Sequence, residues 1–516
     1  MQTVSHQDTA DRRDSEGFEE VVDVAVAGTG FAGLGMAIRM KQEGLHDFVL
    51  LERADEVGGT WRDNTYPGAA CDVPSHLYSF SFALNPEWSR KFSPQEEIQE
   101  YLRRCAREYG IMPHVRFESE ILSADWDEEL RRWEIETTRG RVFAKVFVSG
   151  MGALSDPSFP DVPGLEDFEG HYFHSSQWDH DYNLKGKRVA VVGTGASSIQ
   201  FVPQIQPLVE SLHVFQRTPP WIIPRRDRGF TRLEKWALKS VPGLQKLLRS
   251  GIYWGRESYV LGFSVDTRFM KAIELLARAH LHRQVPDPEL RERLTPDYTI
   301  GCKRILLADD YYPALMQPNA EVLTEGLAKV EGSTVVGSGG SRREVDAIIF
   351  GTGFLIHDLP ASHRIRGRGG TLLADVWREG TEAYNGTTIT GFPNLFLLLG
   401  PNTGVGHTSQ VYMIESQIEY VLSCLKMLER RGAETLEVRE EVQRDYNDRL
   451  QRALRGTVWT SGGCRSWYLD ERGRNYTLWP GFTWRFRRMT READPADYVL
   501  EGRLSTSRRT RRPVAL

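Results

Sequence analysis

The chain has 516 residues, of which 40% are hydrophobic and 26% charged, and its formal net charge is -5. This length exceeds what one hydrophobic core usually holds, so it predicts two or three domains of a soluble globular protein. The negative charge argues against nucleic acid as the main partner, because a phosphate-binding face is usually basic. The five cysteines are scattered and never spaced as CxxC, which fits a reducing cytoplasm and excludes a local metal cage or a short redox-disulfide motif.

The segment 1–20 is polar and acidic, and we expect a disordered lead that lacks the apolar core of a signal peptide. From Val22, VDVAVAGTGFAGLGMAIRMKQEGLHDFVLLER predicts a strand, a glycine turn, a helix and a second strand, which is a βαβ unit. Its turn is Gly28-Thr29-Gly30-Phe31-Ala32-Gly33. Glycines in such a turn let the backbone approach a pyrophosphate, which then lies at the N-terminus of the following helix.

The same pattern returns from Lys187 as KRVAVVGTGASSIQFVPQIQPLVESLHVFQRT, with the turn Gly193-Thr194-Gly195-Ala196-Ser197-Ser198. Ser198 replaces the last glycine, which loosens the fit where helix and strand pack. The two copies differ at the end of the second strand, where Glu52 in the first copy corresponds to Arg217 in the second. This difference predicts that the two copies bind different nucleotides.

A carboxylate such as Glu52 accepts hydrogen bonds from the ribose hydroxyls of an unphosphorylated adenosine and repels a 2′-phosphate. Arg217 and Thr218 offer a bidentate cation and a hydroxyl that suit that phosphate. The first unit is therefore predicted to bind FAD or NAD, and the second NADP. Because one hydride carrier cannot usefully feed another, the pair makes most chemical sense as a flavin and its reductant.

Two later apolar strands each close on a glycine turn: VFAKVFVSGMG ends at Gly152 and VDAIIFGTGF at Phe354, as expected over a cofactor. The segment from about Arg228 to Leu294 differs, because its apolar residues have helical spacing and it contains many bases. We predict a helical insertion whose apolar faces pack against the core, in preference to a membrane-surface role. No run of about 18 apolar residues occurs, so no membrane span is expected.

The stretch FEGHYFHSSQWD has the residue types of a metal or acid/base site, but no further ligands cluster around its two histidines. It matches FxGxxxHxxxW followed by Pro or Asp, the fingerprint of type I Baeyer–Villiger monooxygenases within the class B flavoprotein monooxygenases. The matching residues are Phe168, Gly170, His174, Trp178 and Asp179. A second motif of that family, GxWxxxxYPGxxxD, is met by Gly59, Trp61, Tyr66, Pro67, Gly68 and Asp72. The chain resembles this family from about Val21 to Tyr498.

The resemblance implies site residues, which join those of the two turns. The residues expected to contact FAD are Gly28, Gly30, Phe31, Ala32, Gly33, Glu52, Gly59, Thr60, Trp61, Asp72 and Tyr78. Those expected to contact NADP are Gly193, Thr194, Gly195, Ala196, Ser197, Ser198, Arg217, Thr218, Lys303, Arg304 and Trp467. Lys303-Arg304 looks like the family's catalytic pair, and Ser466-Trp467 like its mobile segment over the nicotinamide. The sequence departs from the family at Ser198 and at Gly351, where many relatives have alanine.

The activity implied is an NADPH- and FAD-dependent insertion of one oxygen atom of O2 next to a ketone carbonyl, which gives an ester or lactone via a C4a-peroxyflavin. Negative charge builds on the peroxide and then on the adduct oxygen, so a preorganised cation contributes most. Arg304 suits this role because it stays charged and donates several hydrogen bonds. Asp72 would hold the guanidinium in place. His174 is expected to lie in a linker that couples the motion of the two domains, and no metal is implied.

The predicted fold class is α/β, with two Rossmann-like dinucleotide-binding domains, for FAD and NADP, and a helical insertion in the NADP domain. The lead is predicted at 1–20 and a basic tail at 503–516. The FAD domain is predicted in two parts, 21–157 and 385–502, of which the second contains the mobile segment. The NADP domain is predicted at 158–227, with the linker fingerprint at 168–179, and at 299–384, with the insertion at 228–298 between its parts.

Other classes remain open at this point. A flavin monooxygenase that oxidises amine nitrogen or sulfide sulfur shares the double nucleotide fold. A pyridine nucleotide–disulfide reductase would need a redox cysteine pair beside the flavin, and a non-catalytic NADP sensor would not require Arg304 or Trp467. We expect a cytoplasmic enzyme that takes a small ketone and O2, with no nucleic acid partner. The sequence names neither the ketone nor the oligomeric state.

Overall fold

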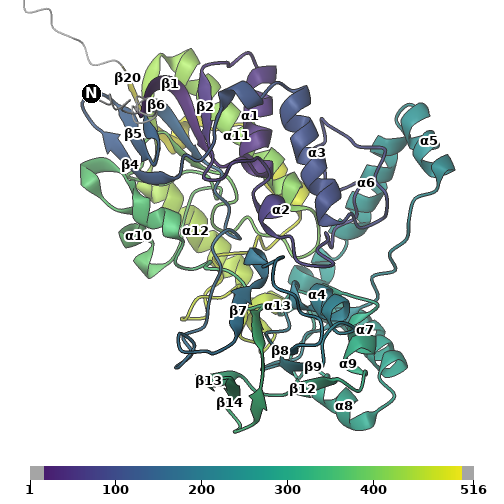
Figure 1. Cartoon of the computed structure of the whole chain (residues 1–516). Helices are drawn as coiled ribbons and strands as arrows, with labels where there is room; N and C mark the ends of the chain where they lie inside the picture. The colour runs from purple at the N-terminus through teal and green to yellow at the C-terminus, as the bar shows by residue number, and fades with distance from the viewer. Residues whose placement is uncertain (1–16, 503–516) are drawn as a thin grey trace, which may run out of the picture.

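The computed structural model describes residues 17–502 and contains two mainly parallel sheets, which lie in the upper and lower parts of the molecule as drawn in Figure 1. The first sheet has eight strands in the order β17-β4-β5-β6-β1-β2-β3, with β18 paired to β6. Its strands are β1 (Phe18–Ala27), β2 (Phe48–Leu51), β3 (Val115–Arg116), β4 (Ile121–Asp127), β5 (Arg132–Thr137), β6 (Gly140–Ser149), β17 (Ile365–Arg366) and β18 (Leu395–Leu397).

The centre of this sheet is buried on both faces. The last four residues of β1 are continuously buried, and the strand runs parallel to β2 and β6, as an apolar strand under helices should. The helices of this domain include α1 (Phe31–Gln42), α3 (Gln95–Glu108) and α11 (Gln410–Arg431), which share one hydrophobic core with the strands. The predicted βαβ unit therefore forms, and the carboxyl ends of β1 and β6 meet at one edge of the sheet.

The second sheet has five parallel strands in the order β12-β9-β8-β16-β7. They are β7 (His171–His174), β8 (Arg188–Val192), β9 (Ser211–Phe215), β12 (Ala320–Leu323) and β16 (Ala347–Phe350). The helices α4 (Ser198–Ile205) and α9 (Tyr311–Leu315) pack on this sheet in a separate core. Both sheets follow the predicted strand–turn–helix pattern, and the predicted α/β class with two Rossmann-like sheets is confirmed.

Three expected boundaries need correction. The lead ends earlier than expected, because β1 begins at Phe18. The chain returns to the first sheet at β17, which pairs with β4 at Ile365, well before the expected boundary of 385. The fingerprint is no free linker, because β7 pairs with β16 as the edge strand of the second sheet. Residues 1–16 and the basic tail 503–516 lie outside the described residues.

The insertion is helical, as predicted, and its helices are α5 (Arg232–Ser240), α6 (Leu244–Glu257), α7 (Met270–Gln284) and α8 (Pro288–Arg293). Figure 1 shows α5 and the start of α6 standing away from both sheets. The expectation that their apolar faces point to the core is wrong for α6. Its buried residues are Tyr253 and Glu257, whereas Leu247 and Trp254 are 70% and 56% exposed.

In the described residues, the remaining elements of the C-terminal part are four helices and one pair of strands. They are α10 (Leu373–Val376), α12 (Glu440–Leu454), α13 (Val458–Ser461), α14 (Thr483–Met489) and the antiparallel pair of β19 (Ala433–Val438) and β20 (Tyr498–Gly502). Smaller elements are α2 (Thr60–Asp63), the pair of β10 (Ile222–Ile223) and β11 (Leu306–Leu307), and the antiparallel sheet of β13 (Leu327–Glu331), β14 (Thr334–Gly337) and β15 (Arg342–Glu344). Within residues 17–502, no helix combines the length and hydropathy that crossing a bilayer requires.

Candidate active site

A cleft of about 270 Å³ opens where β1, β2 and β6 end in the first domain. Gly28 has a φ of +86°, and a Cβ added to Gly33 would lie 1.9 Å from the Gly28 carbonyl oxygen, so the turn needs both glycines. The helix α1 starts at Phe31, which directs its N-terminus at the cleft. The predicted FAD residues that line it are Gly28, Gly30, Phe31, Ala32, Glu52, Gly59, Thr60, Trp61 and Tyr78.

Glu52 follows β2 at this cleft and is almost fully buried. Its carboxylate accepts hydrogen bonds from the backbone and hydroxyl of Thr29 and from the guanidinium of Arg62. It also accepts one from the backbone of Ala54. The protein therefore fixes an acceptor at the end of the strand, and a ribose hydroxyl would share it with these donors. The glycine turn and this carboxylate fit an adenosine diphosphate half such as that of FAD.

The second turn repeats the first with one change. Gly193 has a φ of +104°, and its added Cβ would lie 2.6 Å from the Gly351 carbonyl oxygen, just as Gly28 packs on the turn after β6. A Cβ on Gly351 would lie 2.0 Å from the Ser198 hydroxyl. The two departures from the family are therefore linked, because the Ser198 side chain fills the space that an alanine at 351 would need.

Arg217 and Lys303 form the cationic part of this second site. Arg217 is exposed, and Lys303 lies over the ring of Tyr298 with its ammonium 5.1 Å from the ring centre. Burial and then repulsion by Arg217 lower the pKa of Lys303, with Asp297 opposing. Two cations that repel each other near the end of β9 are an arrangement that a 2′-phosphate would relieve.

Asp72 and Arg304, 232 residues apart in sequence, meet between the two domains in a bidentate ion pair. Arg304 donates from Nε and Nη2 to the two carboxylate oxygens, at 2.8 Å each. The charge of Asp72 raises the pKa of Arg304, although burial opposes this. Burial disfavours the ionised form of Asp72, but the positive charge of Arg304 outweighs it and lowers the pKa of the carboxyl. The guanidinium is thus permanently charged and held in one orientation.

Asp72 lines a separate cavity of about 90 Å³ with Arg304 and no part of the cleft beside Gly28. Its contact with FAD stays a prediction. The other residues around this cavity are Val73, Ile223, Arg256, Tyr259, Phe263, Ile273, Leu276, Ile305, Leu307, Gly406, His407 and Thr408. Most of the side chains are apolar and come from the insertion, from the strand pair β10–β11 and from the segment before α11. The guanidinium therefore stands at one wall of a chamber that carries Arg256, Asp72 and His407 among its apolar side chains.

The predicted C-terminal segment reaches the same region. Tyr468 is buried, which raises the pKa of its hydroxyl, and the nearby Arg304 guanidinium opposes this rise. Two residues before Ser466, Cys464 forms a disulfide with Cys302, the residue that precedes Lys303. Sequence reasoning missed both Tyr468 and this bond, because a separation of 162 residues leaves no spacing signal. Neither cysteine lines the FAD cleft, so the bond is not placed like a flavin-linked redox pair.

The second motif connects the two domains. Tyr66 donates from its hydroxyl to Gln200 of α4, which also bonds the backbone of Ala70 through both amide atoms. A Cβ on Gly68 would lie 2.7 Å from the Gln200 carbonyl oxygen, so this glycine permits the close approach of the two segments. The spacing of the motif therefore serves domain contact at its Tyr-Pro-Gly part and positions Asp72 at its end.

The fingerprint residues have structural contacts. His174 is fully buried, and its Nδ1 bonds the backbone and hydroxyl of Ser176. Burial lowers the pKa of His174 to about 4, with an interaction at the backbone of Gly353 opposing. Trp178 packs on Phe201 of α4. His174 thus fixes the end of β7 as a neutral side chain, and no group of three potential metal ligands occurs in residues 17–502.

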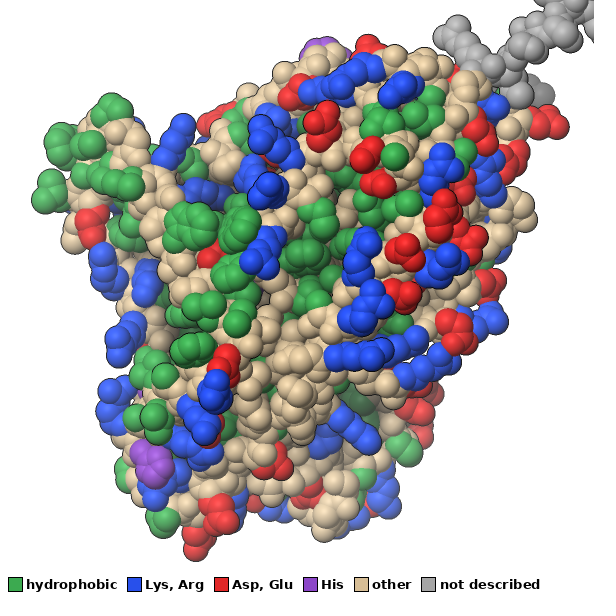
Figure 2. Space-filling view, turned by 180° about the vertical axis from the view of Figure 1, so that it is seen from behind, with side chains coloured by type: hydrophobic (Ala, Val, Ile, Leu, Met, Phe, Trp, Pro, Cys, Tyr) green, Lys and Arg blue, Asp and Glu red, His purple; other side chains and the backbone are tan. Residues whose placement is uncertain are grey.

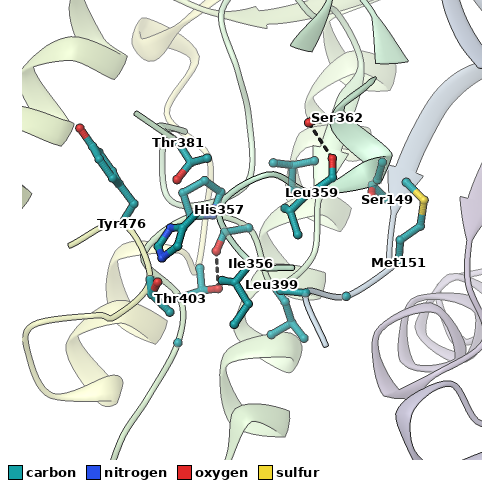
Figure 3. Close-up of a pocket in the computed structure, with 18 of the residues that line it drawn as sticks. Ser149, Met151, Ile356, His357, Leu359, Ser362, Thr381, Leu399, Thr403 and Tyr476 are labelled. Atoms are coloured by element: carbon teal, nitrogen blue, oxygen red, sulfur yellow. Dashed lines mark hydrogen bonds between the residues drawn. The ribbon is translucent and has the colours of Figure 1, made fainter. Parts of the chain in front are cut away.

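A larger cavity of about 200 Å³ adjoins the FAD cleft and is drawn in Figure 3. It shares Met151, Leu154 and Leu399 with the cleft and reaches Tyr476 and the predicted segment residue Trp467. Its walls are mostly apolar. Neither Arg304 nor Asp72 lines it.

Comparison with known proteins places this geometry in a family. The family model for flavin-binding monooxygenase-like proteins matches residues 22–241. A Baeyer–Villiger monooxygenase of Pseudomonas aeruginosa PAO1 is 55% identical over 92% of this chain and 91% of its own length. One of Streptomyces coelicolor A3(2) is 53% identical over 94% and 93%.

Solved structures agree with the fold. Cyclohexanone monooxygenase from Rhodococcus sp. Phi1 bound to NADP+ superposes with a TM-score of 0.83 at 28% identity, covering 94% of this chain and 100% of that one. A steroid monooxygenase bound to NADP gives 0.80 at 29% identity, with 93% and 100% coverage. With this similarity over almost its whole length, the chain belongs to the Baeyer–Villiger monooxygenases, within the flavin-binding monooxygenases.

Proposed function

We propose that Arg304, held by Asp72, is the catalytic cation of this monooxygenase and that a ketone carbonyl reacts in the cavity beside it. The observation that carries the proposal is the bidentate pair between residues of different domains, at the wall of a cavity. The guanidinium needs no rearrangement to receive negative charge, because its position is already fixed. Asp72 acts through Arg304 and is a positioning residue.

We assign FAD to the cleft at Gly28 and NADPH to the turn at Gly193. When bound, FAD that has been reduced by NADPH supplies the reaction with O2 that delivers the oxygen atom. The protein's part is to bind, orient and stabilise charge. Nε and Nη2 of Arg304 face Asp72, so Nη1 is the nitrogen not engaged by the carboxylate and can donate to an oxygen on which negative charge develops.

The cavity side chains support a ketone whose body is apolar. Phe263, Ile273 and Leu276 surround the space next to the Arg304 guanidinium. Contact of an apolar substrate with these walls excludes water, which strengthens the interaction between the guanidinium and a developing oxyanion.

The test uses purified enzyme loaded with FAD, 18O2 and a panel of ketones, amines and sulfides, with product mass as readout. The proposal predicts that ketones gain one 18O atom as esters or lactones, and that NADPH supports this far better than NADH. Incorporation into amines or sulfides without any ester would favour the alternative of a nitrogen- or sulfur-oxidising flavin monooxygenase. Equal use of NADH would contradict the role of Arg217.

We also propose that the enzyme works in the cytoplasm, because its predicted electron donor is NADPH. In such a reducing compartment the pair Cys302 and Cys464 would be held as thiols, and the disulfide would form on oxidation. Extraction into acid with a thiol-trapping reagent would show which state the cell maintains. A fully oxidised pair in freshly trapped cells would contradict the cytoplasmic assignment.

A further inference from the structure

The insertion carries an unusual concentration of exposed large apolar side chains. On α5, Leu233 and Trp236 are 72% and 61% exposed, and on α6 Leu247 and Trp254 continue the pattern. We call these four residues the arm face. Figure 2 shows hydrophobic side chains at the tip and along the length of the projecting arm, at the left of that view. Monomeric proteins seldom leave contiguous apolar surface of this kind without a partner.

Specific contacts of α6 with the body of the protein fix its apolar side towards the outside. Its inner side carries Arg249, which donates to the carbonyls of His76 and Leu77, and Tyr253, which stacks on Tyr412. These anchors fix which way the helix faces. Leu247 and Trp254 are separated by two helical turns and so lie on one side, away from the anchors. The helix therefore binds the body of the protein through Arg249 and Tyr253 and presents its apolar side outward.

The charge around the arm face has the opposite sign to that of the whole chain. The helices α5 and α6, residues 232–257, contain six Lys or Arg and two Asp or Glu, which gives a net charge of +4 in a chain of -5. Within the described residues, the exposed side chains of Arg232 on α5 and Lys246 on α6 have no carboxylate partner. Apolar side chains flanked by unpaired cations are the composition of a helix that lies in the interface of an anionic bilayer.

We propose that α5 and α6 dock on the surface of an anionic lipid bilayer, with the arm face inserted among the lipids and the flanking cations at the headgroups. A second copy of the chain is the weaker occupant, because pairing two arms would bring two segments of +4 together. An anionic bilayer satisfies the apolar and the charged parts at once. Docking of this kind requires no spanning helix.

The insertion that carries the arm face also contributes residues to the cavity beside Arg304. Tyr259, which follows α6, and Leu276 of α7 both line that cavity, yet they are 39% and 41% exposed. The same insertion therefore bears the arm face and the outer wall of the ketone cavity. This refines the substrate class to lipophilic ketones that partition into membranes, and this part of the inference rests on the proposed function of the cavity.

The first experiment measures flotation of FAD-loaded enzyme with vesicles of phosphatidylcholine alone or of phosphatidylcholine mixed with phosphatidylglycerol. We expect binding to the anionic vesicles, weakened at least tenfold by high salt, which screens the cations of the arm. The double variant Trp236→Ser/Leu247→Ser should weaken binding at least tenfold, because two large apolar side chains no longer insert. The matched control is Leu130→Ser, a 60% exposed leucine on the β4–β5 turn, which should bind like the wild type.

The second experiment compares turnover of a long-chain ketone held in the vesicles, 2-tridecanone, with that of soluble 2-butanone. The arm double variant should lose most turnover of the vesicle-borne ketone and keep that of 2-butanone. Absence of vesicle binding by the wild type, or an equal loss in Leu130→Ser, overturns the docking. So does a concentration-dependent dimer, seen by sedimentation, that the arm variant abolishes. Vesicle binding without oxygenation of either ketone would instead count against the proposed function.

Discussion

Ser198 and Gly351 illustrate how single residues depend on each other in the second nucleotide-binding turn. A Cβ added to Gly351 would lie 2.0 Å from the Ser198 hydroxyl oxygen, which is too close for both groups to be present. The glycine at 351 leaves the space that the Ser198 hydroxyl occupies. A change at one position alone should therefore disturb the turn more than a change at both.

We expect Gly351→Ala to destabilise the protein by about 1–3 kcal/mol and to weaken NADPH binding, because the new methyl group overpacks the turn. The double variant Ser198→Gly/Gly351→Ala should recover most of that loss, since the clashing hydroxyl is gone. Thermal unfolding and NADPH titration of the wild type, both single variants and the double variant give the coupling energy. Additive effects of the two substitutions would contradict the proposed contact.

Arg217 decides between the two pyridine nucleotides in this account. Arg217→Ala should raise the KM for NADPH by about tenfold or more while leaving the KM for NADH within about twofold, because only the 2′-phosphate loses a charged partner. Steady-state NADPH and NADH oxidation measures both. Lys303 is a second cation at the site, so some preference for NADPH should persist. An equal loss for both nucleotides would contradict a phosphate-specific role.

At the scale of the elements, the strand β7 contains His174, a fingerprint residue that should make the stability of the fold depend on pH. Burial holds the pKa of His174 at about 4, below its usual 6.5. The unfolded chain therefore binds more protons between these values, so the folded state loses stability as the pH falls from about 6.5 towards 4. At pH 5 this side chain should contribute about 2 kcal/mol of acid destabilisation.

His174→Asn keeps an acceptor near Ser176 but removes the titration. The difference in thermal midpoint between pH 7.5 and pH 5 should therefore be smaller in this variant than in the wild type. His76 is another buried histidine whose pKa burial and then Arg249 lower to about 4, and it remains in both proteins. An unchanged difference would show that His174 does not carry the effect.

The disulfide joins the loop before Arg304 to the segment before Trp467. Reduction should speed tryptic cleavage after the exposed Arg465, because the segment is no longer tied at Cys464. Reductant added to Cys464→Ser should have no further effect, although Cys71, Cys105 and Cys424 remain as buried thiols. Cleavage that is equally fast with and without reductant in the wild type would contradict the tether.

At the scale of the whole molecule, local sequence patterns predicted the two nucleotide-binding units, but they did not predict how the elements are oriented. The turns at Gly28 and Gly193 have short-range glycine patterns, and the register after them located Glu52 and Arg217. The prediction that the apolar side of α6 packs against the core was wrong. A period of 3.6 residues defines two faces of a helix but does not say which one meets the core. The disulfide of the C-terminal segment and the early return to the first sheet depend on contacts distant in sequence, which no local pattern records.

The contact between Asp72 and Arg304 shows the same division. Each residue was identified from a family motif, but their bidentate geometry and the cavity beside them arise only when the two domains meet. This contact carries the central claim that the guanidinium stabilises charge during oxygenation and has no part in hydride delivery. The two half-reactions can be measured separately.

Single-turnover kinetics of Arg304→Ala test that claim most directly, with Arg139→Ala on an exposed turn as the control. Flavin reduction by NADPH should stay within about threefold of the wild type, whereas ester formation from a ketone should fall by about 10²–10³. The control should match the wild type in both steps. Ester formed by Arg304→Ala at close to the wild-type rate would contradict the account.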